Sequence, residues 1–162
     1  MVFIANILAA IRQGFHHEDI RFGMPISRVT AKLGRPDSMY GDNQCGYITY
    51  DFLRIGHFEN IVDQVAILFE RDSNLQFTID KENSDDEGNI IKAGMMLHDF
   101  ISLLNMHGIF WQSQYRQNEL DYVSLRVENG SDVTFHLDTG AIYQIAFLPP
   151  AVLDKISLAN AM

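Results

Sequence analysis

The sequence is poor in cysteine and in positive charge. Cys45 is the single cysteine among 162 residues, so an internal disulfide is excluded, as is typical of proteins from a reducing compartment. Lysine and arginine number 12 against 21 aspartates and glutamates, which gives a formal charge of −9. A negative field of this size repels phosphate backbones and argues against nucleic-acid binding. It favours a basic protein partner, or it simply keeps the protein soluble.

Long hydrophobic runs are also missing. No apolar stretch approaches the roughly 20 residues that a membrane-spanning helix needs. The apolar segment 1–10 has neither a basic residue before its apolar run nor a lipobox cysteine, so it does not resemble a signal sequence. Its apolar residues recur at helical spacing over 3–11, and Gly14 stands where a helix commonly ends. We therefore expect an amphipathic N-terminal helix in a cytoplasmic protein without membrane contact.

The pattern that is present is an internal match at a spacing of 71 positions. Ile20-Arg21-Phe22-Gly23-Met24 corresponds to Ile91-Lys92-Ala93-Gly94-Met95. Apolar residues at helical spacing follow each segment, and they are Ile26, Val29 and Leu33 in the first and Leu97, Phe100 and Leu104 in the second. Short strand-like segments come next in both cases. The match predicts two tandem copies of one helix-then-sheet unit.

The expected fold is therefore α+β, with two tandem repeats of a helix followed by an antiparallel three- to four-stranded meander, and an N-terminal helix. The segments are 1–19 (helix and connector), 20–80 (first repeat), 81–89 (acidic linker), 90–150 (second repeat) and 151–162 (short helix). Strands are expected at 47–50, 52–58, 62–69, 75–79, 120–127, 133–137 and 142–148. Residues 37–46 are rich in Gly, Asp and Asn and predict a loop. A three-stranded sheet with one helix is marginal alone, so the copies are expected to pack together in one domain.

No motif has the spacing of a metal or nucleophile site. The chain contains no Cys-x-x-Cys, His-Glu-x-x-His or Gly-x-Ser-x-Gly motif and no phosphate-binding glycine loop. The adjacent ligand-type residues of 16–19 diverge on any regular element, which favours a solvated connector. Cys45 could act as a nucleophile only if a histidine lay close to it. We expect no enzyme activity, cofactor or metal.

Two alternatives remain open from the sequence. An enzyme or small-ligand site could use His98, Asp99 and His107 in a pocket between the two repeats. The chain could instead be a structural protein that self-associates through the apolar helix over 3–11.

Carboxylates and aromatic residues near turns are the best candidates for a binding surface. Aromatic anchors dominate interface energetics, and carboxylates attract basic partners. The candidate interface residues are Tyr40, Asp42, Glu82, Asp85, Asp86, Glu87 and Trp111.

One segment resembles a known group of proteins. Leu33-Gly34-Arg35-Pro36-Asp37, the strand from Tyr50 to Phe58 and the apolar run from Val65 to Phe69 are similar to a pattern in small bacterial α+β proteins. The helix with Leu-Gly-x-Pro also resembles the repeat unit of outer-membrane assembly lipoproteins and of tandem-repeat β-lactamase inhibitor proteins. Proteins of this type include immunity partners of bacterial toxins. The resemblance implies a binding sheet and a role as an immunity protein. Together with the negative charge of the chain, it leads us to expect a non-enzymatic inhibitor that occludes a basic, nuclease-like toxin.

Overall fold

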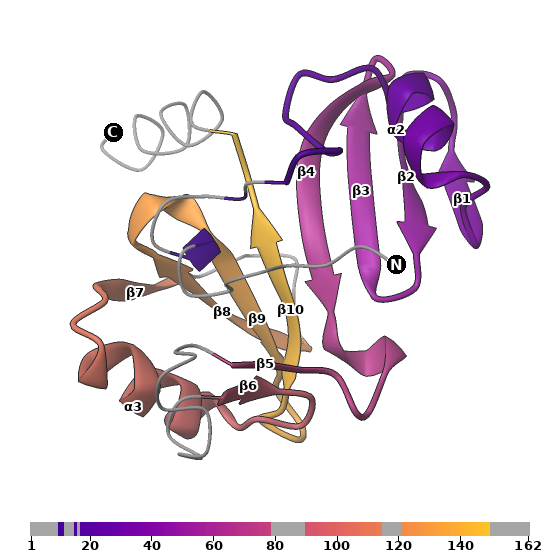
Figure 1. Cartoon of the computed structure of the whole chain (residues 1–162). Helices are drawn as coiled ribbons and strands as arrows, with labels where there is room; N and C mark the ends of the chain where they lie inside the picture. Colours follow the sequence, from indigo (N-terminus) through magenta and orange to yellow (C-terminus); the bar gives the residue numbers. More distant parts are fainter. Residues whose placement is uncertain (1–9, 12–14, 16, 79–89, 115–120, 150–162) are drawn as a thin grey trace.

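The computed structural model describes residues 10–11, 15, 17–78, 90–114 and 121–149 (Figure 1). Its main feature is one antiparallel sheet of eight strands in the order β1-β2-β3-β4-β10-β9-β8-β7. These strands are β1 (Ser38–Gly41), β2 (Cys45–Tyr50), β3 (Leu53–Phe58), β4 (Ile61–Leu68), β7 (Trp111–Gln114), β8 (Tyr122–Val127), β9 (Asp132–His136) and β10 (Ile142–Phe147). A second sheet pairs β5 (Gln76–Thr78) with β6 (Ile90–Lys92).

The helices lie where the apolar spacing predicts them. Helix α2 (Ile26–Leu33) buries Val29, and helix α3 (Leu97–Met106) buries Phe100, Leu103 and Leu104. Short 3₁₀ turns occupy Phe69–Arg71 and Glu128–Gly130. In Figure 1, α2 lies near the half of the sheet that holds β1 to β4, and α3 lies near the half that holds β7.

The predicted fold of two tandem helix–meander repeats is wrong, because the molecule is mostly β and its main strands form one continuous sheet. Strand β4 pairs with β10 over four residue positions, from Gln144 opposite Leu68 to Phe147 opposite Val65. The four residues of β4 from Val65 to Leu68 are all buried, so this strand needs a neighbour on each edge and cover on each face. The segment expected as a last strand of the first repeat instead pairs with β6 in the small sheet.

The match at 71 positions corresponds to a local turn. Gly23 and Gly94 both adopt left-handed backbone angles, with φ of 79° and 76°, which glycine reaches without steric strain. Just beyond each turn, the N–H of the first helical residue donates to a carbonyl oxygen outside the helix, at 2.8 Å for Ile26 and 2.9 Å for Leu97. The repeated sequence therefore specifies how each helix begins and docks.

The hydrophobic core lies on one face of the sheet. Ile55 on β3 faces Ile48 and Val65 on the neighbouring strands, and all three are almost fully buried. In the other half, Phe100 of α3 meets Phe135 of β9 edge to face, with ring centroids 5.6 Å apart. On the opposite face, Cys45 and Phe58 are exposed and Tyr47 is half-buried, whereas Thr49 is fully buried.

Several predicted segments fall outside the described residues. They are most of the N-terminal helix over 3–11, the acidic linker 81–89 and the terminal helix 151–162. Within the described ranges, no helix has the length and apolar character needed to cross a bilayer.

Candidate functional site

An exposed apolar surface lies at the β1 edge of the main sheet. Residues directly opposite each other in an antiparallel pair share a face, and so do residues two apart on one strand. Tyr40 lies opposite Tyr47, Cys45 lies opposite Phe58, and Phe58 lies opposite Ile61. These five side chains therefore lie on one face of β1 to β4, and we call them the edge patch.

Four of the five side chains of the edge patch are exposed, and Tyr47 is half-buried. Tyr40 is 70% exposed, Phe58 56% and Ile61 37%, and Cys45 is exposed as well. The rings of Tyr40 and Tyr47 stack with centroids 5.2 Å apart, which holds Tyr40 in place at the sheet edge. A rigid aromatic surface of this kind loses little side-chain entropy when a partner covers it.

Arg54, the lysine or arginine nearest the edge patch, is engaged within the sheet. Its guanidinium lies 5.4 Å from the centre of the Tyr47 ring, and its Nη2 donates to Gln144 Oε1 at 2.5 Å. Residues 38–68 contain four carboxylates and no other lysine or arginine. This part of the sheet is therefore locally acidic.

Two of these carboxylates border the edge patch. Asp42 occupies the turn between β1 and β2, where its Oδ1 accepts from the N–H groups of Gln44 (2.7 Å) and Cys45 (3.1 Å). The backbone hydrogen bonds from Cys45 and Gln44 lower the pKa of Asp42, so it keeps its charge in mildly acidic solution. Glu59 occupies the turn between β3 and β4, and its N–H joins the two turns by donating to the Gln44 carbonyl at 2.6 Å.

A third carboxylate lies on a bulge of β4. The register shifts so that His57 faces Val62 while Gly56 faces Gln64, which leaves Asp63 as an extra residue. Burial raises the pKa of Asp63, and this effect exceeds the opposing effects of its own backbone N–H and of His57.

Cys45 and His57 do not form a catalytic pair. His57 is 8% exposed and lies opposite Gly46, the residue after Cys45. Successive side chains on a strand point to opposite faces, so Cys45 lies on the face away from His57. A Cβ atom on Gly46 would lie 3.1 Å from His57 Nε2, so the small residue leaves room for the ring.

The predicted interface residues are not brought together. Tyr40 and Asp42 are at the β1 edge, whereas Trp111 is on β7 at the opposite edge. Seven inter-strand steps of about 4.8 Å separate these edges by roughly 34 Å. Trp111 is half-buried, packs against the core and donates its Nε1–H to Asn105 Oδ1 at 3.0 Å, so its contacts are those of a structural residue. The linker carboxylates Glu82, Asp85, Asp86 and Glu87 lie outside the described residues.

His98, Asp99 and His107 do not converge on a pocket. His98 Nε2 lies 3.2 Å from Asp99 Oδ1, but these side chains are 77% and 56% exposed. His107 follows the other end of α3, about 14 Å along the helix axis at 1.5 Å per residue. Asp99 borders a hollow of about 390 Å³ between β6 and α3, whose lining includes neither histidine.

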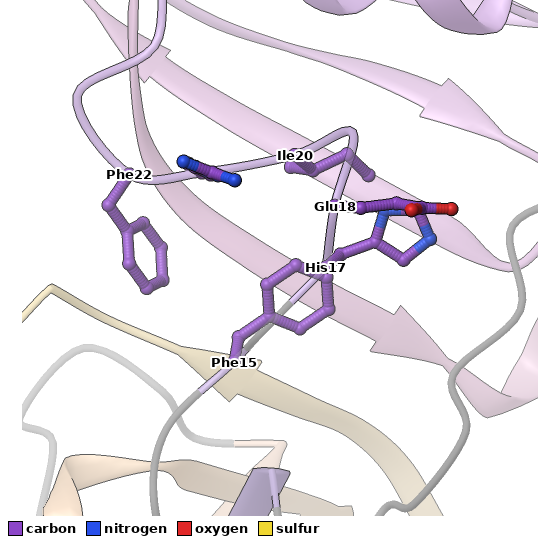
Figure 2. A pocket seen from close by; sticks show the side chains of 6 residues that line it. Phe15, His17, Glu18, Ile20 and Phe22 are labelled. Atoms are coloured by element: carbon purple, nitrogen blue, oxygen red, sulfur yellow. The ribbon is translucent and has the colours of Figure 1, made fainter.

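A larger hollow of about 600 Å³ lies along the connector before α2. Figure 2 shows Phe22 on one side of the group, His17 and Glu18 on the other, and Phe15 between them. His17 Nδ1 accepts the N–H of Asp19 at 3.1 Å, and the His17 ring stacks on Phe15. Among the described residues, no cluster of three or more His, Cys, Asp or Glu side chains could hold a metal ion. The connector contacts are those of local packing.

The predicted interface set does not include Tyr47, Phe58 and Ile61 of the edge patch. The alternation in β3 carries the signal, since Leu53, Ile55 and His57 form the buried set and Phe58 must therefore face the other way.

Comparison with known proteins gives little further information. No family model and no curated protein matches the chain. A crystal structure of a cysteine-rich secretory protein from Staphylococcus aureus is similar with a TM-score of 0.36 and 13% sequence identity. That match covers 82% of this chain and 44% of the staphylococcal one, so the chain spans less than half of that protein. A similarity of this size carries no argument about function.

Proposed function

We propose that this chain is a non-enzymatic protein-binding module whose edge patch contacts a basic protein. The observation that carries the proposal is the exposed aromatic pair Tyr40 and Phe58 beside the carboxylates of Asp42 and Glu59. Protein interfaces commonly combine buried aromatic anchors with a polar rim that excludes water. The pairing of Arg54 with Tyr47 and Gln144 leaves the carboxylates of the two turns to an incoming cation.

We further propose that the partner is a basic toxin of the nuclease type, and that the chain acts in the cytoplasm as its immunity or inhibitor protein. A nuclease groove is built to attract phosphate, so an acidic surface is electrostatically complementary to it. The mechanism is occlusion, in which the partner's cationic groove binds over the edge patch and can therefore no longer bind its substrate. The resemblance of 29–69 to small bacterial α+β proteins and immunity proteins agrees with this proposal.

The test is capture of partners from the native organism with matched variants. Tagged wild-type protein, Phe58→Ser and Phe110→Ser are compared by elution with salt and mass spectrometry. Phe110 is 67% exposed and lies immediately before β7, so it is an equally exposed phenylalanine far from the edge patch. We expect a basic protein with wild type and Phe110→Ser, and about 30-fold weaker binding with Phe58→Ser, as for an interface hot spot.

Salt and gene context sharpen this test. Capture should weaken at high ionic strength, because pairing between exposed charges is screened. A gene for the captured protein beside the gene for this chain would support the toxin assignment. The proposal would be contradicted if Phe58→Ser captured as much partner as the wild type does, or if the captured partner were not basic.

A further inference from the structure

The outermost strand of the main sheet, β1, has one unpaired edge among the described residues. It pairs only with β2, and all four of its residues are exposed. Natural proteins commonly protect such edges with proline, charged side chains or bulges. Within Ser38-Met39-Tyr40-Gly41 there is no proline or charged residue, and the pairing with β2 has no register shift, so the edge is protected only by its length of four residues and by Asp37 and Asp42 at its ends.

The register identifies the backbone groups on the open side. The N–H of Asp42 donates to the Cys45 carbonyl at 3.1 Å, so these two residues form a hydrogen-bonded pair. In an antiparallel ladder, hydrogen-bonded and non-hydrogen-bonded pairs alternate, which makes Tyr40 and Tyr47 the next hydrogen-bonded pair. Met39 lies between such pairs, so its N–H and C=O point away from β2 toward the open edge.

The negative charges beside β1 favour an added strand that carries positive charge. Asp37 and Asp42 flank β1 at its two ends. A second copy added through its own β1 would bring its own Asp37 and Asp42 to the same edge, and the repulsion between these like charges opposes that pairing. An extended segment with arginine or lysine would instead bring a cation to Asp42, which lies on the same face as Tyr40, and place its aliphatic stem over the Tyr40 ring.

We propose that β1 accepts an extended arginine- or lysine-bearing segment of the partner as an additional antiparallel strand. This inference rests on the proposed function, since it names how the same basic partner docks. Main-chain hydrogen bonds to Met39 supply affinity in this arrangement, and the edge patch and its carboxylates supply selectivity.

The test uses a decapeptide of alternating arginine and valine, with the alternating glutamate and valine peptide as its control. Wild type, Met39→Pro and Met39→Thr are compared by calorimetry and amide exchange. Proline removes the outward N–H while sparing the bonds to β2, and it is tolerated on edge strands. Threonine removes the same side chain but keeps the N–H and the strand propensity.

We expect wild type to bind the arginine peptide only, with slower exchange at the Met39 amide. Met39→Pro should weaken binding about tenfold, which corresponds to one lost hydrogen bond, and Met39→Thr less than about threefold. An arginine peptide N-methylated at alternate residues tests the ligand side without any change to the protein. It should bind the wild type about tenfold more weakly, because it lacks donors along one edge.

Strand addition would be overturned if Met39→Pro bound the arginine peptide as tightly as the wild type does, and if the methylated peptide bound the wild type as tightly as the unmethylated one does. In that case Phe58-dependent capture of a basic protein would still support the proposed function. Failure of the wild type to bind the arginine peptide, with Phe58-dependent capture intact, would also overturn strand addition alone. Absence of any captured basic partner would overturn both proposals.

Discussion

The ion pair between Arg126 and Asp132 should make a large contribution to the stability of the sheet. These residues lie opposite each other on β8 and β9, with Nε–Oδ1 and Nη2–Oδ2 distances of 2.8 Å. Only 13% of the arginine side chain and 2% of the aspartate side chain are exposed. Removing the arginine of a buried pair takes away the counter-ion and both hydrogen bonds from the carboxylate, which costs about 3–5 kcal/mol. We therefore expect Arg126→Leu to lower the free energy of unfolding by this amount.

That loss is a large part of the roughly 5–15 kcal/mol that stabilises a typical domain. For a chain of this size, each kcal/mol shifts Tm by about 2–4 °C, so the expected shift is roughly 6–20 °C. The assay is denaturant and thermal unfolding followed by circular dichroism. The matched control is Arg28→Leu on α2, an exposed arginine whose replacement should change stability by less than about 0.5 kcal/mol.

A second change separates charge from packing. Adding Asp132→Asn to Arg126→Leu should recover part of the lost stability, because the buried negative charge that has lost its arginine is then gone. A loss below about 1 kcal/mol for Arg126→Leu, or no recovery in the double variant, would refute the claim that this pair is buried and mutually dependent.

Further predictions concern the acidic surface and the two sheet edges. Burial raises the pKa of Asp63 in the folded state, so its contribution to stability is greatest below the ordinary aspartate pKa and declines as pH rises through the folded-state value. Asp63→Asn should therefore raise Tm at pH 7 and change Tm little near pH 3. The same change in Tm at both pH values would contradict this. In an NMR titration Asp42 should titrate below its ordinary range and Asp63 above it, and the reverse order would contradict the described turn and bulge. Phe58→Ser and Phe110→Ser should both change stability by less than about 0.5 kcal/mol, since both side chains are exposed, and a large loss for either would show hidden packing. Trp111 is the only tryptophan and lies at the far edge, so its emission should not change when a partner binds at β1, and a clear spectral shift would place the partner elsewhere.

Local patterns were sufficient for the helices and for most strands. The apolar spacing specifies α2 and α3, and alternation or apolar runs specify β2 to β4 and β8 to β10. Strand β1 was expected to be part of a loop, because four exposed residues carry no burial pattern. Its pairing with β2, rather than its own composition, makes it a strand.

The arrangement of the strands could not be read from local patterns. The pairing of β4 with β10 joins residues nearly 80 positions apart, and the sequence of neither strand indicates which strand it pairs with. That single contact converts two expected meanders into one sheet. It also puts Tyr40 and Trp111 on opposite edges, so two residues that looked alike in the sequence have different surroundings.

The most direct test of the central claim is amide hydrogen exchange across the whole chain, with and without the captured basic partner. We expect slower exchange in β1, in the turn that holds Asp42 and around Phe58 and Glu59, with no change in β7. Slower exchange confined to β7, α3 or the connector before α2, with β1 unchanged, would contradict it.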